Sequence, residues 1–136
     1  MTDDLLLNKA ATIERCVARA REEYATNPDG FDQDFTRQDA AILNIQRACE
    51  AALDMGHYLV RREHLGIPQS ARDVFALLHK GDWIDLALTE NLQRMVGFRN
   101  IAVHDYHTLH LPIVVSIITK ELDNLLTFSR VLLQKG

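Results

Sequence analysis

Hydrophobic residues recur along the chain in steps of three and four, the period of an amphipathic α-helix. We expect a helix over residues 2–24, a second of close to 30 residues from 36, a third over 70–79, a fourth from 82 and a last from 112. Nowhere does the chain alternate apolar and polar residues as a half-buried strand would. The expected core stripes are Leu6, Ala10, Ile13, Val17, Ala20 and Tyr24; Ile42, Ile45, Cys49, Ala52 and Leu59; Ile84, Leu88, Leu92, Met95 and Val96; and Val114, Ile118, Leu122, Leu125, Phe128 and Leu132.

Capping signals mark where these helices begin and end. A side chain that accepts a hydrogen bond from the first turn favours a start, whereas glycine favours a stop. The expected starts are Thr36 with Asp39 and the apolar staple residue Phe35, Ser70 with Asp73, Asp82, and Pro112 in a first turn; the expected stops are Gly66 and Gly81.

These elements predict an all-α fold: an antiparallel, up-and-down bundle of four long helices and one short helix. The 136 residues are expected to form a single domain, 1–136, and 47% of them are hydrophobic, which is enough for a packed core. Only three prolines and six glycines interrupt the chain, which favours long elements joined by short connections.

Charge and cysteine content narrow the function. The formal net charge of −4 argues against a protein that wraps a long nucleic-acid duplex, so any nucleic-acid role must use a small local site. Cys16 and Cys49 form no C-x-x-C pair and are expected to be small core residues of a cytoplasmic protein. No signal peptide and no apolar run long enough to span a bilayer are recognisable.

The octapeptide "RNIAVHDY" (99–106) interrupts the apolar pattern between two predicted helices. Arg99 could bind a phosphate through two hydrogen bonds, and His104 could transfer a proton near neutral pH. Tyr106 could donate a hydrogen bond or stack on a base. Together these side chains suit the cleavage of RNA phosphodiesters, whereas Asn100 and Asp105 are expected to fix the backbone.

Helix geometry complicates this hypothesis, because Arg99 and His104 are ~140° apart around an ideal helix. The motif must therefore cross the end of a helix, or two copies must meet across a dimer. Two other interpretations stay open. The side chains could be ordinary solvated groups, or His104, His107 and His110 with Asp105 could ligate zinc, although their spacing matches no established zinc pattern.

The segment "MVGFRNIAVHDY" resembles the R-x-x-x-x-H-x-Y signature of HEPN-domain proteins, and "RREHLGIPQSARDVFALL" resembles the segment before it in the HepT branch of that family. That branch comprises the toxins of HepT/MntA toxin–antitoxin pairs. The resemblance extends from about Leu5 to Leu132 and implies the five-helix HEPN fold.

The resemblance also implies roles for individual residues. Arg99 and His104 fall on the ribonuclease residues of the family, whose activity needs no metal or other cofactor, and Asn100 falls on a supporting polar residue. Tyr106 falls on the tyrosine to which a minimal nucleotidyltransferase antitoxin attaches AMP. The implied assembly is a homodimer whose two motifs face one RNA-binding cleft. The alternatives are a non-catalytic dimeric module that binds nucleotide or a nucleotidyltransferase, and a purely structural bundle.

Overall fold

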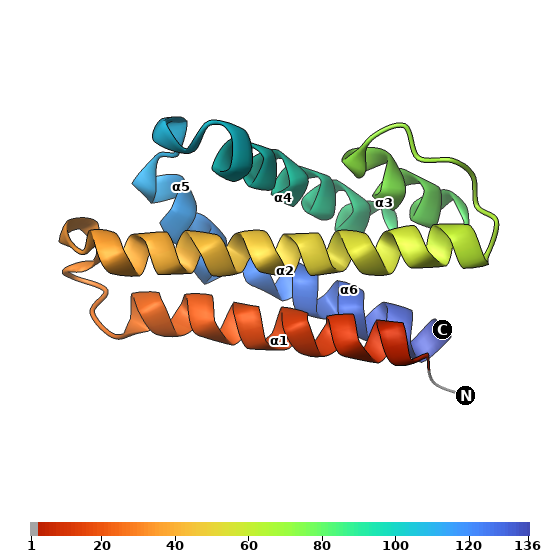
Figure 1. The fold of residues 1–136 in the computed structure, drawn as a ribbon, viewed down its shortest axis with the longest axis horizontal. Coiled ribbons are helices and arrows are strands. Elements are labelled where there is room, and N and C mark those ends of the chain that lie inside the picture. The colour runs from red at the N-terminus through yellow and green to blue at the C-terminus, as the bar shows by residue number, and fades with distance from the viewer. Residues whose placement is uncertain (1–2) are drawn as a thin grey trace.

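The structure, a computed structural model that describes residues 3–136, is helical and contains no strand in that range (Figure 1). Its elements are α1 (Asp4–Ala25), η1 (Phe31–Gln33), α2 (Phe35–Arg62), α3 (Ala71–Lys80), α4 (Leu86–His104), η2 (Tyr106–Thr108), α5 (Leu111–Ser116), η3 (Ile117–Glu121) and α6 (Leu122–Lys135). The predicted start of the first helix at Thr2 lies outside the described residues. In the part of the chain that is described, no helix combines the length and apolar character needed to cross a membrane.

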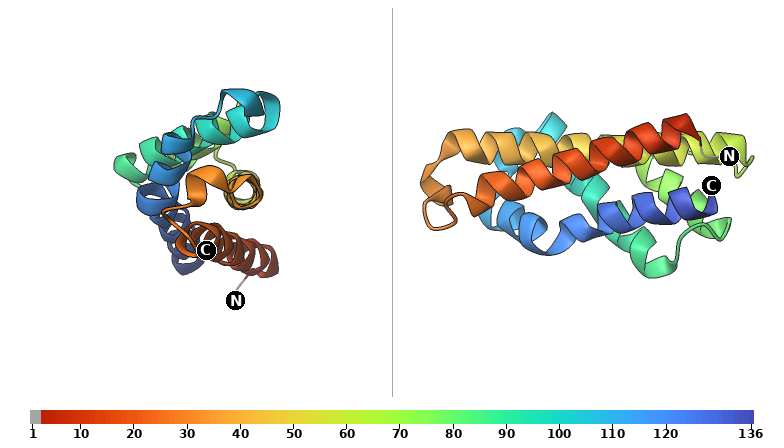
Figure 2. Two further views of the ribbon diagram at one scale, coloured as in Figure 1. Left: turned by 90° about the vertical axis from the view of Figure 1, so that its left-hand side faces the viewer. Right: turned by 90° about the horizontal axis from the view of Figure 1, so that it is seen from below.

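The helix α2 is the centre of the bundle, since it contacts α1, α3, α4 and α6. It runs antiparallel to α1 along the long axis, and the start of α1 and the end of α6 lie at the same end of the molecule (Figures 1 and 2). The chain reverses its direction at the opposite end, where α4 leads through η2 into α5 (Figure 1). The predicted all-α bundle of four long helices and one short helix is confirmed.

The predicted apolar stripes form the core. All of their residues are buried except Tyr24, which packs partly buried against the others. Several of the buried positions on α2 are small, including Ala48, Ala52 and Gly56. Small side chains let neighbouring helices approach closely, which explains how a single helix can contact four others.

Two of the predicted helix starts are wrong. The helix α2 begins at Phe35, where the Asp34 carboxylate accepts a hydrogen bond from the Arg37 amide at 3.1 Å, so Thr36 is not the cap. Phe35 is 71% exposed and staples nothing. The helix α4 is capped by Asp85 rather than Asp82, because Asp82 has a φ of 64° and cannot take the extended backbone that a cap needs.

The start at Ser70 is confirmed, because its hydroxyl accepts a hydrogen bond from the Asp73 amide at 3.2 Å. The last helix begins at Leu111, next to Pro112, as expected. It is not one regular α-helix, however, since η3 is a π-helical turn in which the Leu122 amide donates to the Ile117 carbonyl. Bonding over five residues places Ile117 and Leu122 one turn apart, and both are buried.

The absence of a side chain at Gly56 allows α3 to pack closely on α2. A larger residue at this position is therefore expected to destabilise the fold. A Cβ at this position would lie 2.6 Å from Cγ1 of the fully buried Val74. We expect Gly56→Ala to lower the free energy of unfolding by about 1–3 kcal/mol, measured by urea denaturation at fixed protein concentration.

Gly97→Ala is the matched control in a helix interior. Its Cβ would lie 2.8 Å from Nη2 of Arg72, the mobile end of an exposed side chain that can move away. The free energy of unfolding should therefore change by less than about 1 kcal/mol, because the higher helix propensity of alanine offsets part of any loss. Equal losses in the two variants would show that the α2–α3 contact is not tight.

Candidate functional site

The motif crosses the end of a helix, as one of the two geometric alternatives predicted. Arg99 and Asn100 lie in the last turns of α4, His104 is its final residue, and Tyr106 begins η2. The helix ends because Asp105 adopts a φ of −151° while its amide still donates to the Ile101 carbonyl at 2.8 Å. Tyr106 therefore does not continue the helix face that carries Arg99.

Arg99 is half-buried, and its guanidinium is only partly satisfied. Its Nη1 donates to Oδ1 of Asn100 at 3.0 Å, whereas its Nε is buried and has no hydrogen-bond partner among the described residues. The guanidinium makes no ion pair with any described carboxylate. A buried donor without a partner lowers the stability of the fold by about 1–3 kcal/mol and is uncommon in folded proteins. Its presence at Arg99 therefore indicates a functional site.

Arg99 borders a cleft of about 420 Å³ between α4, the middle of α2 and the loop that leads into α3. The helix α2 contributes Glu50, Leu53, Asp54 and His57, and the loop with the first residue of α3 contributes residues 68–71. This loop belongs to the "LGIPQSARD" segment, so the two stretches that resemble the HepT branch meet at one cleft.

The sequence alone did not identify the residues of α2 that line the cleft. Glu50, Asp54 and His57 are spaced four and three residues apart and are exposed, so they form a polar stripe on α2. That spacing is visible in the sequence, but it is also typical of an ordinary solvated helix face. Only the packing of α4 beside α2 identifies it as part of the site.

His104 is exposed, and its ring makes no hydrogen bond with a described residue. It is not among the residues that line the Arg99 cleft. Within one chain, therefore, the structure does not bring the two predicted catalytic side chains into the same hollow.

Tyr106 connects the motif to the start of α2, since its hydroxyl donates a hydrogen bond to the Asp39 carboxylate. Partial burial and, after it, this contact raise the pKa of Tyr106 to about 12. The residue remains 41% exposed. Asp39 was expected to act in a capping box; instead it holds a side chain 67 residues away.

The zinc alternative has no geometric support. Among residues 3–136, no group of three or more histidine, cysteine, aspartate or glutamate side chains is placed to hold a metal ion. His104, His107 and His110 are therefore not gathered into a ligand set. Cys49 is no candidate nucleophile either, because burial raises the pKa of its thiol to about 12.

The contact between Tyr106 and Asp39 predicts an alkaline titration. In Asp39→Asn, the pKa of Tyr106 should fall from about 12 but stay above 10, since burial is the larger cause and persists. The absorbance of the phenolate as a function of pH measures this pKa. The Tyr106→Phe variant identifies which part of the signal comes from Tyr106, and Asp32→Asn is a control that removes the same charge elsewhere.

The stability that this contact contributes should be complete below about pH 10 and disappear as the pH rises toward 12, because the pKa is raised in the folded state. If Tyr106 titrates near 10 in the unchanged protein, the contact does not persist in solution.

Comparisons with known proteins found relatives that match most of the chain. Residues 13–132 match the family described as "Ribonuclease HepT-like". The chain is 48% identical over 122 residues to the mRNA nuclease HepT of Shewanella oneidensis, which covers 90% of this chain and 91% of the relative.

Two solved structures are similar over nearly the whole chain. One is from a toxin–antitoxin crystallised with AMP-PNP, with a TM-score of 0.91, 46% identity and 95% and 97% of the two chains covered. The other is the tri-AMPylated Shewanella oneidensis HEPN toxin in complex with the MNT antitoxin, with a TM-score of 0.90, 47% identity and 95% and 96% covered. The chain therefore belongs to the HepT-like ribonuclease family of HEPN toxins.

Proposed function

We propose that this chain is the toxin of a toxin–antitoxin pair: a metal-independent ribonuclease of the cytoplasm that uses Arg99 and His104 and is silenced when its antitoxin attaches AMP to Tyr106. The observation that carries the proposal is the state of Arg99. Its half-buried guanidinium lies at an open cleft, is held by Asn100, and is not neutralised by the carboxylates of Glu50 and Asp54 that line the same cleft. Such a cation is prepared to bind an anion.

The chemistry follows from these groups. The 2′-hydroxyl of RNA attacks the adjacent phosphorus while its proton is removed, and the bond from phosphorus to the 5′-oxygen breaks as that oxygen gains a proton. His104 takes part in one of the two proton transfers. Arg99 stabilises the negative charge that accumulates on the phosphoryl oxygens, and Asn100 orients Arg99 through the 3.0 Å hydrogen bond. No step requires a metal ion.

A homodimer would bring the separated groups together. Since His104 does not line the cleft of its own Arg99, a second copy placed with its motif facing the first can complete the site. Exposed apolar side chains lie within the motif and after it, with Ile101 41%, Val103 44% and Ile113 50% exposed. A second copy would cover them and bury apolar area.

The toxin role and its control are supported by the relatives. A neighbour of 47% identity is AMPylated and bound to an MNT antitoxin, and a curated relative is an mRNA nuclease. Tyr106 suits such a modification, since it lies on a short 3₁₀ turn outside the bundle and is partly exposed. An AMP group there would add a phosphate that can pair with Arg99 and an adenosine in the path of the RNA.

The catalytic assignment predicts that Arg99→Ala and His104→Ala each lower RNA cleavage by about 10²–10⁴-fold and remove toxicity. Circular dichroism should show an unchanged fold, and EDTA should leave the unmodified protein active. Arg94→Ala and His107→Ala change the same residue types nearby and should retain activity. Undiminished cleavage by His104→Ala would exclude its catalytic role, and the absence of cleavage by the unmodified protein would favour the non-catalytic module.

The modification site is tested by mass spectrometry after incubation with the partner nucleotidyltransferase and ATP. The protein should gain mass in steps of one AMP on the peptide that contains Tyr106, and Tyr106→Phe should gain none. Tyr58→Phe is the control, because Tyr58 also donates its hydroxyl to a carboxylate, that of Asp3. A gain that persists in Tyr106→Phe would place the switch elsewhere.

The dimer predicts a mass of about twice 15.5 kDa by light scattering at micromolar concentration. Ile113→Glu should lower the mass toward that of one chain, because it places a charge in the apolar surface beside the motif. Leu7→Glu changes a side chain of similar exposure, 46%, on α1 and should remain dimeric. A monomeric unmodified protein would contradict the shared site.

A further inference from the structure

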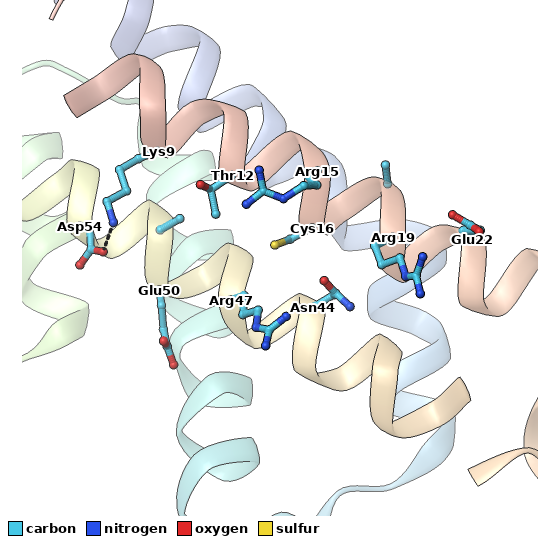
Figure 3. A pocket seen from close by; sticks show the side chains of 12 residues that line it. Lys9, Thr12, Arg15, Cys16, Arg19, Glu22, Asn44, Arg47, Glu50 and Asp54 are labelled. Atoms are coloured by element: carbon cyan, nitrogen blue, oxygen red, sulfur yellow. Dashed lines mark ion pairs between the residues drawn. The ribbon is translucent and has the colours of Figure 1, made fainter. Parts of the chain in front are cut away.

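A second hollow of about 700 Å³ lies between α1 and α2 (Figure 3). Cationic side chains occupy both of its walls, with Arg15 and Arg19 on α1 and Arg47 on α2. Its floor includes Cys16 and Ala51, both buried and small, so the groove stays open where two larger side chains would fill it.

Two of these cations are not neutralised. Lys9 pairs with Asp54 at 3.0 Å at one end of the groove, and Arg19 pairs with Glu23 at 3.4 Å. Arg15 and Arg47 are exposed and form no ion pair or side-chain hydrogen bond with a described residue. Figure 3 shows them near the middle of the groove, one on each helix.

The groove adjoins the cleft that contains Arg99. Glu50 and Asp54 line both hollows, so the two meet over the exposed side of α2. The lining residues of α2 extend from Asn44 to His57, ~20 Å at the rise of an α-helix. Arg15, Arg47 and Arg99 therefore line two adjoining hollows that share two residues of α2, although they come from three different helices.

We infer that the α1–α2 groove binds the phosphate backbone of single-stranded RNA beside the scissile phosphate, through Arg15 and Arg47; this rests on the proposed ribonuclease function. Guanidinium groups bind phosphate through paired hydrogen bonds. The groove has no aromatic residue on which a base could stack, so it favours contacts to the backbone that do not depend on sequence. The groove is lined by four cationic side chains, Lys9, Arg15, Arg19 and Arg47, against the three carboxylates of Glu22, Glu50 and Asp54. In a chain of net charge −4, this local excess of positive charge can attract a polyanion.

Glu50 opposes this binding at the junction of the two hollows. Asp54 is neutralised by Lys9, but Glu50 only accepts a hydrogen bond from the neutral Gln46 at 3.1 Å. A strand that crosses from the groove to Arg99 therefore passes an uncompensated carboxylate. Removing this charge should strengthen RNA binding, an effect opposite in sign to that of removing the arginines.

The test measures the affinity of a labelled single-stranded RNA long enough to span both hollows, and of a dinucleotide. All variants are made in the His104→Ala background to prevent cleavage. The double variant Arg15→Gln/Arg47→Gln should bind the long RNA about tenfold more weakly or worse, with a salt dependence reduced by about 0.7 for each lost phosphate contact. Binding of the dinucleotide should be unchanged. Glu50→Gln should bind the long RNA more tightly.

Arg130→Gln is the matched control, since Arg130 is exposed on α6 and lies outside the groove. Unchanged affinity of the double variant for long RNA would overturn the inference. So would intact RNA binding with loss of the antitoxin complex, because the groove would then serve the protein partner. Long-RNA binding that depends on Arg15 and Arg47, in a protein that cleaves no RNA, would support the groove and refute the ribonuclease proposal.

Discussion

The packing of small residues along α2 is the constraint on which the rest of this molecule depends. Alanine, glycine and cysteine at the buried positions of α2 allow α1, α3, α4 and α6 to approach the same helix. Because four helices pack against α2, the position of its exposed polar stripe, which contains Glu50, Asp54 and His57, is also set by this packing. Both hollows described above use that stripe as a wall, and Tyr106 is held at its first turns.

The chain is acidic as a whole, yet most of the arginines that line its two hollows are not balanced by a described carboxylate. Arg19 pairs with Glu23, whereas Arg15, Arg47 and Arg99 make no ion pair with a described residue, and they line two hollows that share residues of α2. An acidic body with a few uncompensated guanidinium groups would attract nucleic acid at one place and repel it elsewhere, which suits an enzyme that must engage a strand without coating it.

The helices and their buried faces could be predicted because the apolar period is a local property of the sequence. The ends of α2 and α4 could not, since Asp34, Thr36, Asp82 and Asp85 are all plausible caps and the backbone decides between them. The motif residues were found from their chemistry and from a family resemblance. The α2 wall was not, because Asp39 and Glu50 look like ordinary helix residues until packing places them opposite residues more than 45 positions later.

The contact between Tyr106 and Asp39 has a consequence for any modification of that tyrosine. Its hydroxyl is the donor of the hydrogen bond, and an oxygen esterified to a phosphate has no proton left to donate. The Asp39 carboxylate would then face a second anion. The hydrogen bond from Tyr106 to Asp39 and an AMP group on the Tyr106 oxygen are therefore mutually exclusive. By linkage, the free energy that this hydrogen bond contributes opposes the modification and favours its reversal by the same amount.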